Sequence, residues 1–227
     1  MIVDFNYLLA TGQVLGKRAG EEMYEVTGTC AAYVLPHLVL TAGHCVPNQF
    51  EEFAVALPAR EGVWKAEQLI RHPEADVAAI LIRKHPQDLP NCAFTGIEER
   101  VFDAGDFHTY GFPAEGEGAV RRYFKGHFQR FMSYTDPSGR SYSAGEMSIP
   151  APAGLSGGPI SWTQSLDKLA GIVTTNHDSY LVVDSFEEFE RNGSVTRGQI
   201  RRVTTYGIAA MLLPLKEWLD ELVESNR

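Results

Sequence analysis

Short runs of apolar, β-branched and aromatic residues recur along the chain, broken by Gly, Pro, Asn or Asp at intervals of roughly 8–12 residues. This spacing is typical of antiparallel sandwiches and barrels. The predicted strands are 29–35, 38–40, 53–57, 63–70, 77–82, 107–110, 120–131, 160–162, 169–175, 180–183 and 203–209. The pattern therefore predicts an all-β protein.

A helical period is strong in one place, the C-terminus. Apolar residues there recur with the spacing of one helix face: Leu215, Trp218, Leu219, Leu222 and Val223. Charged residues lie between them, and Pro214 suits a first helical turn. We predict an amphipathic helix over 212–227, and a weaker helical pattern covers 186–191.

The composition limits the functional classes. The chain has 227 residues, 44% hydrophobic and 22% charged, which is the balance of a globular protein of one or two domains. Lys and Arg number 20 against 29 Asp and Glu, for a net charge of −9. We therefore expect no nucleic-acid partner, because phosphate binding needs a basic surface. The chain has no apolar run of 18 residues, so we expect no membrane association through a spanning helix.

The start of the chain lacks a basic segment followed by an apolar one, so we expect no secretory signal and a cytoplasmic location. Three cysteines, Cys30, Cys45 and Cys92, are too few for a disulfide scaffold. Neither the cysteines nor the histidines have the spacing of metal ligands, and we expect neither a metal nor a cofactor.

Three short motifs place candidate chemistry along the chain. The segment 38–45 (LVLTAGHC) leads an apolar strand into a small-residue turn that ends in His44 and Cys45. In 72–82 (HPEADVAAILI), Asp76 opens an apolar strand, where a carboxylate needs a partner. The segment 152–160 (PAGLSGGPI) is a glycine-rich turn around Ser156, in which the N–H groups of Gly154 and Ser156 can point toward one oxyanion.

The three motifs together are far more specific than any one of them. A serine hydroxyl needs an imidazole to take its proton, and the imidazole needs a carboxylate to fix its tautomer. His44, Asp76 and Ser156 supply these groups in that chain order.

At these motifs the sequence resembles the chymotrypsin/trypsin-like serine peptidases, over TAGHC at 41–45, DVAAI at 76–80, GLSGGP at 154–159 and GIVT at 171–174. The resemblance implies two six-stranded antiparallel β-barrels, 1–98 and 99–211, followed by the helix 212–227. It implies a serine endopeptidase acting on peptide or protein substrates through His44, Asp76 and Ser156, with an oxyanion hole at Gly154 and Ser156. It also implies that the Thr174 hydroxyl supports the carboxylate.

The chain departs from the family at several positions. Leu155 stands where zymogen-activated members have an acid, so we expect no activation by N-terminal cleavage and leave open an activating protein partner. Cys30 and Cys45 match a pair that forms a disulfide in the family, here of undetermined redox state.

The resemblance places the primary specificity pocket at Pro150, Thr175, Asn176 and Gly207. No acid stands at Pro150, so we expect small or apolar residues, not Lys or Arg, before the cleaved bond. The long segment 176–205 is expected to rim the cleft.

Two other functions fit parts of the sequence. The same scaffold could be a catalytically silent binding module, since fold alone does not decide function. The segment 154–158 also matches the G-x-S-x-G pattern of α/β-hydrolase esterases, although that fold needs a helix directly after Ser156 and alternating strands and helices. Five basic residues between 121 and 140 predict a solvated hairpin, or alternatively a binding loop: Arg121, Arg122, Lys125, Arg130 and Arg140.

Overall fold

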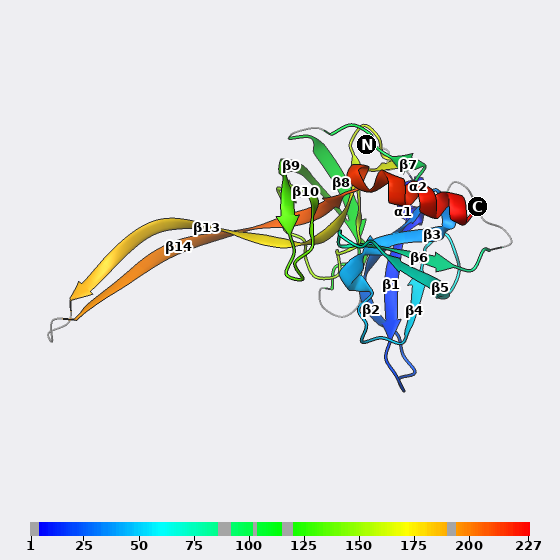
Figure 1. The fold of residues 1–227 in the computed structure, drawn as a ribbon, viewed down its shortest axis with the longest axis horizontal. Coiled ribbons are helices and arrows are strands. Elements are labelled where there is room, and N and C mark those ends of the chain that lie inside the picture. Colours follow the sequence, from blue (N-terminus) through cyan, green and yellow to red (C-terminus); the bar gives the residue numbers. More distant parts are fainter. Residues whose placement is uncertain (1–4, 86–91, 102–103, 115–119, 190–193) are drawn as a thin grey trace.

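Two closed, six-stranded antiparallel barrels form the body of the protein (Figure 1). The structure is a computed structural model that describes residues 5–85, 92–101, 104–114, 120–189 and 194–227. The first barrel has the strand order β1-β2-β3-β6-β5-β4. Its strands are β1 (Thr11–Lys17), β2 (Glu25–Tyr33), β3 (Leu35–Ala42), β4 (Glu52–Ala56), β5 (Trp64–Arg71) and β6 (Val77–Ile82).

The second barrel has the strand order β10-β14-β13-β11-β8-β9. Its strands are β8 (Asp106–Gly111), β9 (Arg122–Thr135), β10 (Ser141–Met147), β11 (Pro159–Trp162), β13 (Gly171–Phe189) and β14 (Val195–Met211). The predicted all-β fold with two six-stranded barrels is therefore confirmed.

Each barrel closes around its own apolar side chains, because inward residues alternate with outward ones along every strand. Leu38, Leu40 and Ile80 of the first barrel are fully buried and belong to one apolar core. Phe107, Phe128, Met147, Ile160 and Trp162 belong to the core of the second barrel.

The predicted C-terminal helix is α2 (Lys216–Ser225), preceded by a 3₁₀ turn (Leu213–Leu215) that contains Pro214. Its buried residues Leu219, Leu222 and Val223 belong to the predicted apolar face. The helix packs on the first barrel, where the ring of Trp218 lies edge-on to His72. A short N-terminal helix, α1 (Phe5–Ala10), was not predicted. Neither α1 nor α2, the α-helices of the described residues, is long and apolar enough to cross a membrane.

A short parallel pair, β7 (Gly96–Ile97) and β12 (Lys168–Leu169), joins the chain between the barrels to the second barrel. It is too short to be detected as an alternating pattern.

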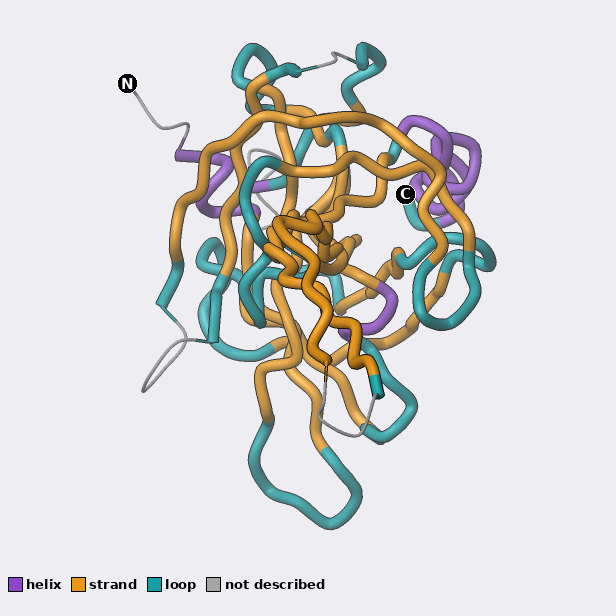
Figure 2. Tube along the Cα trace, turned by 90° about the vertical axis from the view of Figure 1, so that its left-hand side faces the viewer, coloured by secondary structure: helices purple, strands orange, loops and turns teal. Residues whose placement is uncertain are grey.

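The paired strands β13 and β14 extend past the second barrel as a long two-stranded arm (Figure 1). Figure 2 views the molecule from the side on which the arm projects. Two expectations for this region are wrong. The segment 176–205 was expected to rim the cleft, but its described residues form the arm, because Asn176 through Phe189 pair with Gly207 through Val195, with one register shift between Val182 and Asp184. The weak helical pattern at 186–191 falls on strand β13 as far as Phe189, and residues 190 and 191 lie outside the described residues.

Candidate active site

Strand pairing in the first barrel brings His44 and Asp76 together. Strands β3 and β6 are antiparallel, and Ala42 at the end of β3 pairs with Val77 at the start of β6. His44 lies just beyond β3, in a 3₁₀ turn (Gly43–Cys45), and Asp76 immediately precedes β6. The Gly43 N–H also donates to the Asp76 carbonyl at 3.1 Å. The two side chains therefore meet because the end of β3 lies directly beside the start of β6.

The Asp76 carboxylate holds His44 through two contacts. Its Oδ2 lies 2.6 Å from His44 Nδ1, and its Oδ1 accepts the His44 backbone N–H at 3.0 Å. Asp76 is buried, whereas about half of the His44 side chain is exposed. Burial on its own lowers the pKa of His44, but the hydrogen bonds and charges of Asp76 and Cys45 outweigh it and raise that pKa above its ordinary value.

Arg140 contacts the same carboxylate, a contact that the sequence did not predict. Its Nη2 donates to Asp76 Oδ1 at 2.8 Å, and its Nε donates to Asp136 Oδ2 at 2.8 Å. Arg140 follows the turn between β9 and β10, so the second barrel supplies a cation to the candidate triad residue of the first. Burial alone would raise the pKa of Asp76, but His44 and Arg140 lower it below its ordinary value.

The basic segment 121–140 thus divides in two. Arg122, Lys125 and Arg130 lie on β9 with exposed side chains, as a solvated hairpin predicts. Arg140 instead faces two carboxylates that are each only 5% exposed. Its one detectable signal was Asp136, the single acid in an otherwise basic run.

Thr174 occupies a different role from the one expected. Its hydroxyl was expected to support the Asp76 carboxylate, but it donates to the Ile208 carbonyl at 3.1 Å and accepts from the Tyr142 hydroxyl at 3.3 Å. Among the described residues, the donors to Asp76 side-chain oxygens are His44 and Arg140. The arginine therefore takes the place predicted for the threonine hydroxyl.

The Ser156 hydroxyl donates to the Thr174 carbonyl at 3.0 Å. Within the residues that the structure describes, it has no hydrogen bond to His44. A serine side chain has three staggered positions about Cα–Cβ, separated by low barriers. The Ser156 hydroxyl is therefore bonded to β13, and a hydrogen bond to His44 requires it to leave the Thr174 carbonyl.

The turn around Ser156 is fixed by Thr29 of the first barrel. The Thr29 N–H donates to the Ser156 carbonyl at 2.7 Å, and its hydroxyl donates to the Gly154 carbonyl at 2.7 Å. The Gly154 and Ser156 N–H groups, predicted to bind an oxyanion, make no hydrogen bond to the described part of the chain.

Gly157 is required by this turn. Its φ of +85° is in the left-handed region, and a Cβ built there would lie 1.8 Å from the Thr29 carbonyl oxygen. No other residue fits between the turn around Ser156 and β2. The glycine-rich motif therefore reflects close packing of the two barrels at this point.

Leu155 anchors the same turn from the other side. It is fully buried and belongs to the core of the second barrel with Ile160 and Trp162. A buried leucine stabilises the turn by apolar packing, where an acid would need a cationic partner.

The residues predicted to form the specificity pocket lie close together, and hydrogen bonds join the segments that carry them. The Asn176 side chain accepts from the Ala151 N–H at 2.7 Å and donates to the Ala151 carbonyl at 2.8 Å. The Gly207 N–H donates to the Ile149 carbonyl at 2.8 Å. Pro150 lies between these two bonded residues and is exposed. Thr175 pairs with Ile208 beside Gly207.

The three cysteines Cys30, Cys45 and Cys92 are buried free thiols. Burial and the neighbouring Cys45 raise the pKa of Cys30 well above its ordinary value, which keeps it protonated. The described residues contain no group of three or more His, Cys, Asp or Glu side chains placed to hold a metal ion.

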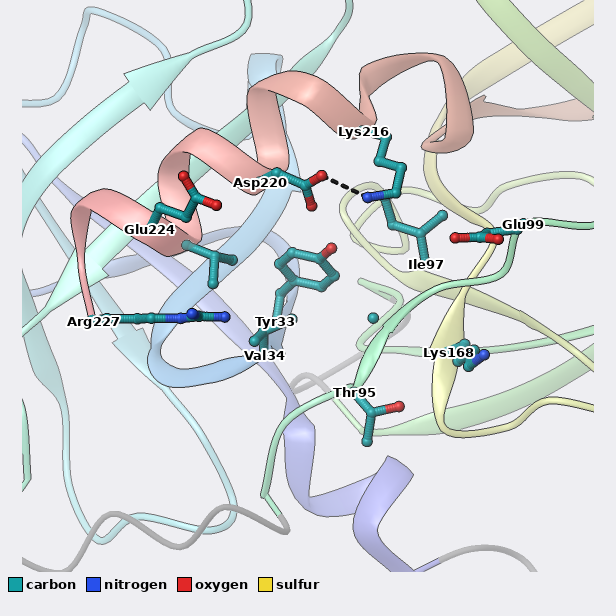
Figure 3. Close-up of a pocket in the computed structure, with 12 residues that line it drawn as sticks. Tyr33, Val34, Thr95, Ile97, Glu99, Lys168, Lys216, Asp220, Glu224 and Arg227 are labelled. Atoms are coloured by element: carbon teal, nitrogen blue, oxygen red, sulfur yellow. Dashed lines mark hydrogen bonds and ion pairs between the residues drawn. The ribbon is translucent and has the colours of Figure 1, made fainter.

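A separate cavity of about 430 Å³ lies between α2, β7 and the turn that joins β2 to β3 (Figure 3). Its lining has equal numbers of basic and acidic side chains: Lys168, Lys216 and Arg227, and Glu99, Asp220 and Glu224. Lys216 and Asp220 are paired with each other at 2.5 Å. His44, Asp76 and Ser156 do not line this cavity, so it is not part of the candidate active site.

No protein-family model matches the sequence, and no curated protein matches it. Solved structures do match the fold. The MamO protease domain of Magnetospirillum magneticum, in its apo form, superposes with a TM-score of 0.64 at 14% identity, covering 94% of this chain and 97% of that one. The HtrA-type protease AlgW with a decapeptide superposes with a TM-score of 0.65 at 16% identity, covering 98% of this chain and 68% of that one.

The Rv3671c protease of M. tuberculosis, in its active form, gives a TM-score of 0.59 at 16% identity, covering 74% of this chain and 70% of that one. At such low identity, these likenesses establish the fold alone. The chain has the trypsin-like serine peptidase fold, as the sequence motifs predicted.

Proposed function

We propose that this protein is a serine endopeptidase in which Ser156 is the nucleophile, His44 the general base and Asp76 the residue that orients His44. The observation that carries the proposal is the 2.6 Å contact between the buried Asp76 carboxylate and His44 Nδ1. Such a contact keeps the Nδ1 proton in place and leaves Nε2 to accept a proton. The structures with this fold named above are proteases, which supports peptide or protein substrates.

The reaction proceeds through an acyl-enzyme. Ser156 leaves the Thr174 carbonyl for the rotamer that reaches His44, which takes the hydroxyl proton as Oγ attacks the peptide carbonyl. The oxyanion is bound by the Gly154 and Ser156 N–H groups, and His44 then protonates the leaving amine. Water, deprotonated by His44, releases the acyl group and restores Ser156.

The nucleophile turn needs no new N-terminus to hold it. Thr29 donates hydrogen bonds to the carbonyls of Gly154 and Ser156, and Leu155 packs into the core of the second barrel. We therefore propose that the oxyanion site forms on folding, without N-terminal cleavage. An activating protein partner would act on Ser156, by moving its hydroxyl from the Thr174 carbonyl toward His44.

One observation favours a second candidate, a catalytically silent binding module. The Ser156 hydroxyl is bonded to Thr174 and not to His44. Hydrogen bonds of catalytic groups are often poorly aligned without substrate, so the intact triad side chains favour the peptidase. The esterase alternative needs an α/β sheet and a helix after Ser156, whereas the chain is all-β and enters β11 at Pro159.

Cleavage of a peptide library tests the proposed function and its specificity together. We expect new termini with the wild-type chain and none with Ser156→Ala. The residue before the cleaved bond should be small, because the Asn176 amide crosses the pocket to Ala151. Asn176→Gly removes the hydrogen bonds to Ala151 and makes room in the pocket for a few methylene groups. Cleavage after Leu or Phe should then rise about tenfold relative to cleavage after Ala.

The matched control is Asn48→Gly, which removes an exposed asparagine outside the pocket and should leave the profile unchanged. An identical profile for Asn176→Gly and wild type would contradict the assignment of the pocket. Cleavage mainly after Lys or Arg would contradict it as well.

A further inference from the structure

The turn that joins β9 to β10 is built around the Asp136 carboxylate, which is only 5% exposed. This carboxylate accepts four hydrogen bonds: from the Ser138 N–H at 2.9 Å, the Ser138 hydroxyl at 2.6 Å, the Arg140 N–H at 3.0 Å and Arg140 Nε at 2.8 Å. The Asp136 N–H also donates to the Arg140 carbonyl at 2.9 Å. Both the backbone and the guanidinium of Arg140 are therefore held in place within the turn itself.

The guanidinium of Arg140 lies against the turn that carries His44. A Cβ built on Gly43 would lie 2.9 Å from Asp76 Oδ1 and 3.3 Å from Arg140 Nη1. The absence of a side chain directly before His44 thus leaves room for the guanidinium, which donates through Nη2 to Asp76 Oδ1 at 2.8 Å. Arg140 of the second barrel is therefore packed together with His44 and Asp76 of the first.

The guanidinium fixes how the Asp76 carboxylate faces His44. Asp76 Oδ1 accepts two donors, the His44 N–H at 3.0 Å and Arg140 Nη2 at 2.8 Å. Asp76 Oδ2 is then left to His44 Nδ1, at 2.6 Å. Turning the carboxylate part of the way about its Cβ–Cγ bond would break both contacts at Oδ1. The group that orients the imidazole is thus itself held in orientation by its neighbours.

The same guanidinium offsets part of the Asp76 charge. When His44 takes the Ser156 proton, the adjacent carboxylate stabilises the imidazolium. A cation beside that carboxylate opposes the imidazolium, and the effect is strong because Asp76 is buried, where charges are screened less than in water. Without Arg140, the charges of Asp76 and Asp136 would be uncompensated, and His44 would hold its proton more tightly.

The other ionisable groups that the second barrel places near Asp76 supply no cation. Tyr134 of β9 and Tyr142 of β10 lie close enough to Asp76 to sense its charge, and burial raises the pKa of both, so they are neutral at neutral pH. Asp136 is an anion that contacts Arg140. As far as this barrel is described, Arg140 is therefore the cation that it brings to the carboxylate.

The described residues of the first barrel add no cation to the pair either. Arg71, at the end of β5, donates instead to the Val46 carbonyl. Burial lowers the pKa of His72, which is therefore neutral at neutral pH. Cys45 directs its Sγ to the Ser156 carbonyl at 3.5 Å. The charge state of the candidate triad histidine therefore depends on the balance between the carboxylate and the guanidinium.

We propose that Arg140 is a positioning residue for the reaction: it holds the Asp76 carboxylate against His44 and offsets part of its charge, so that the histidine can accept a proton at a lower pH than Asp76 alone would allow. This inference rests on the proposed peptidase function. The histidine and the aspartate come from the first barrel and the arginine from the second. The working pH of the site therefore depends on how the two barrels are joined.

The pH dependence of kcat/KM on one cleaved peptide tests the proposal. Arg140→Gln removes the positive charge, and the acid limb of the profile should move about one pH unit higher. The rate at pH 7 should then be about tenfold lower than that of the wild type, and the deficit should vanish above the apparent pKa of the variant. Arg140→Lys retains the charge and should keep the wild-type limb. Urea unfolding of each variant shows that the protein is folded at the pH of each rate.

Arg130→Gln is the matched control. Arg130 Nη2 donates to the buried Glu146 carboxylate at 2.8 Å, between the same two strands. No hydrogen bond of the described chain joins either residue to His44 or Asp76. The substitution therefore removes an arginine–carboxylate pair of the same hairpin, and the acid limb should stay in place.

Titration of His44 by NMR gives a readout that needs no activity. In Ser156→Ala protein with labelled histidine, the His44 signal is assigned by its loss in His44→Gln. Its pKa should be about one unit higher when Arg140→Gln is added, and unchanged with Arg140→Lys. If Arg140→Gln does not fold, Asp136→Asn/Arg140→Gln removes the buried carboxylate left without its cation and should shift the titration in the same direction.

The outcomes separate this inference from the proposed function. If peptide is cleaved and neither the acid limb nor the His44 titration moves in Arg140→Gln, Arg140 is only structural and the inference is wrong. If Arg140→Lys moves the limb as far as Arg140→Gln does, the charge is not what matters, and the inference is wrong as well. If no peptide is cleaved, the proposed function fails, and the His44 titration by itself decides whether Arg140 controls the charge of His44.

Discussion

Asp76→Asn is expected to reduce kcat/KM about 10⁴-fold without unfolding the protein. The surroundings of Asp76 dictate how the amide will sit. The Oδ1 position accepts from the His44 N–H and from Arg140, so the amide oxygen must occupy it. The amide NH₂ then faces His44 Nδ1, which must become an acceptor and place the ring proton on Nε2. In that tautomer, His44 cannot take a proton from Ser156.

Asp136→Asn is the matched control, because Asp136 contacts Arg140 but does not contact His44. It should retain activity within about tenfold of wild type, since the substitution removes the Asp136 hydrogen bond to Arg140 but leaves the contact between Asp76 and His44 in place. Steady-state rates on one cleaved peptide measure both variants. Equal losses in Asp76→Asn and Asp136→Asn would mean that Asp76 acts through its charge and not by orienting His44.

Arg140→Ala is expected to lower the free energy of unfolding by about 2–4 kcal/mol at pH 7. The substitution leaves Asp76 and Asp136 buried without the cation that bridges them, at 2.8 Å from each. Removing one partner of a buried ion pair costs more than the pair contributes, because the remaining charge keeps its desolvation cost. Urea unfolding of the wild type and the variant measures the difference.

The loss of unfolding free energy in Arg140→Ala should become smaller as the pH falls. The pKa values of both carboxyls are lowered in the folded protein, so the stability they contribute is present above their unfolded value of about 3.9 and is lost as the pH falls through the folded values. The gap between wild type and Arg140→Ala should therefore shrink in acid. Lys125→Ala, which breaks an exposed pair with Asp106, should show little loss at any pH. A gap that persists unchanged at pH 3 would mean that Arg140 acts by packing.

Much of the architecture could be predicted from the sequence, because alternating apolar residues and turn signals are local properties. The strand β6 and the helix α2 are examples, since β6 is a continuous apolar run and α2 has a clear helical period. The arm could not be predicted in the same way. Its strands are exposed on both faces, so the pattern of 176–205 lacks the alternation that a buried face imposes.

The candidate triad was predictable because its residues sit in short motifs, each with glycines or small residues that close packing requires. The contact of Arg140 with Asp76 was not, since it joins residues 64 positions apart on different barrels. Nor could the sequence predict the Ser156 rotamer, which depends on the position of the Thr174 carbonyl in the folded chain.

The most direct test of the central claim, that Ser156 is activated by His44, is labelling with a fluorophosphonate followed by mass spectrometry of the modified peptide. We predict one covalent adduct on Ser156, absent in Ser156→Ala. The reaction should be faster at pH 9 than at pH 7, because the pKa of His44 is raised and only its neutral form accepts the proton. A folded wild-type chain that forms no adduct, or an adduct that persists in Ser156→Ala, would contradict the account.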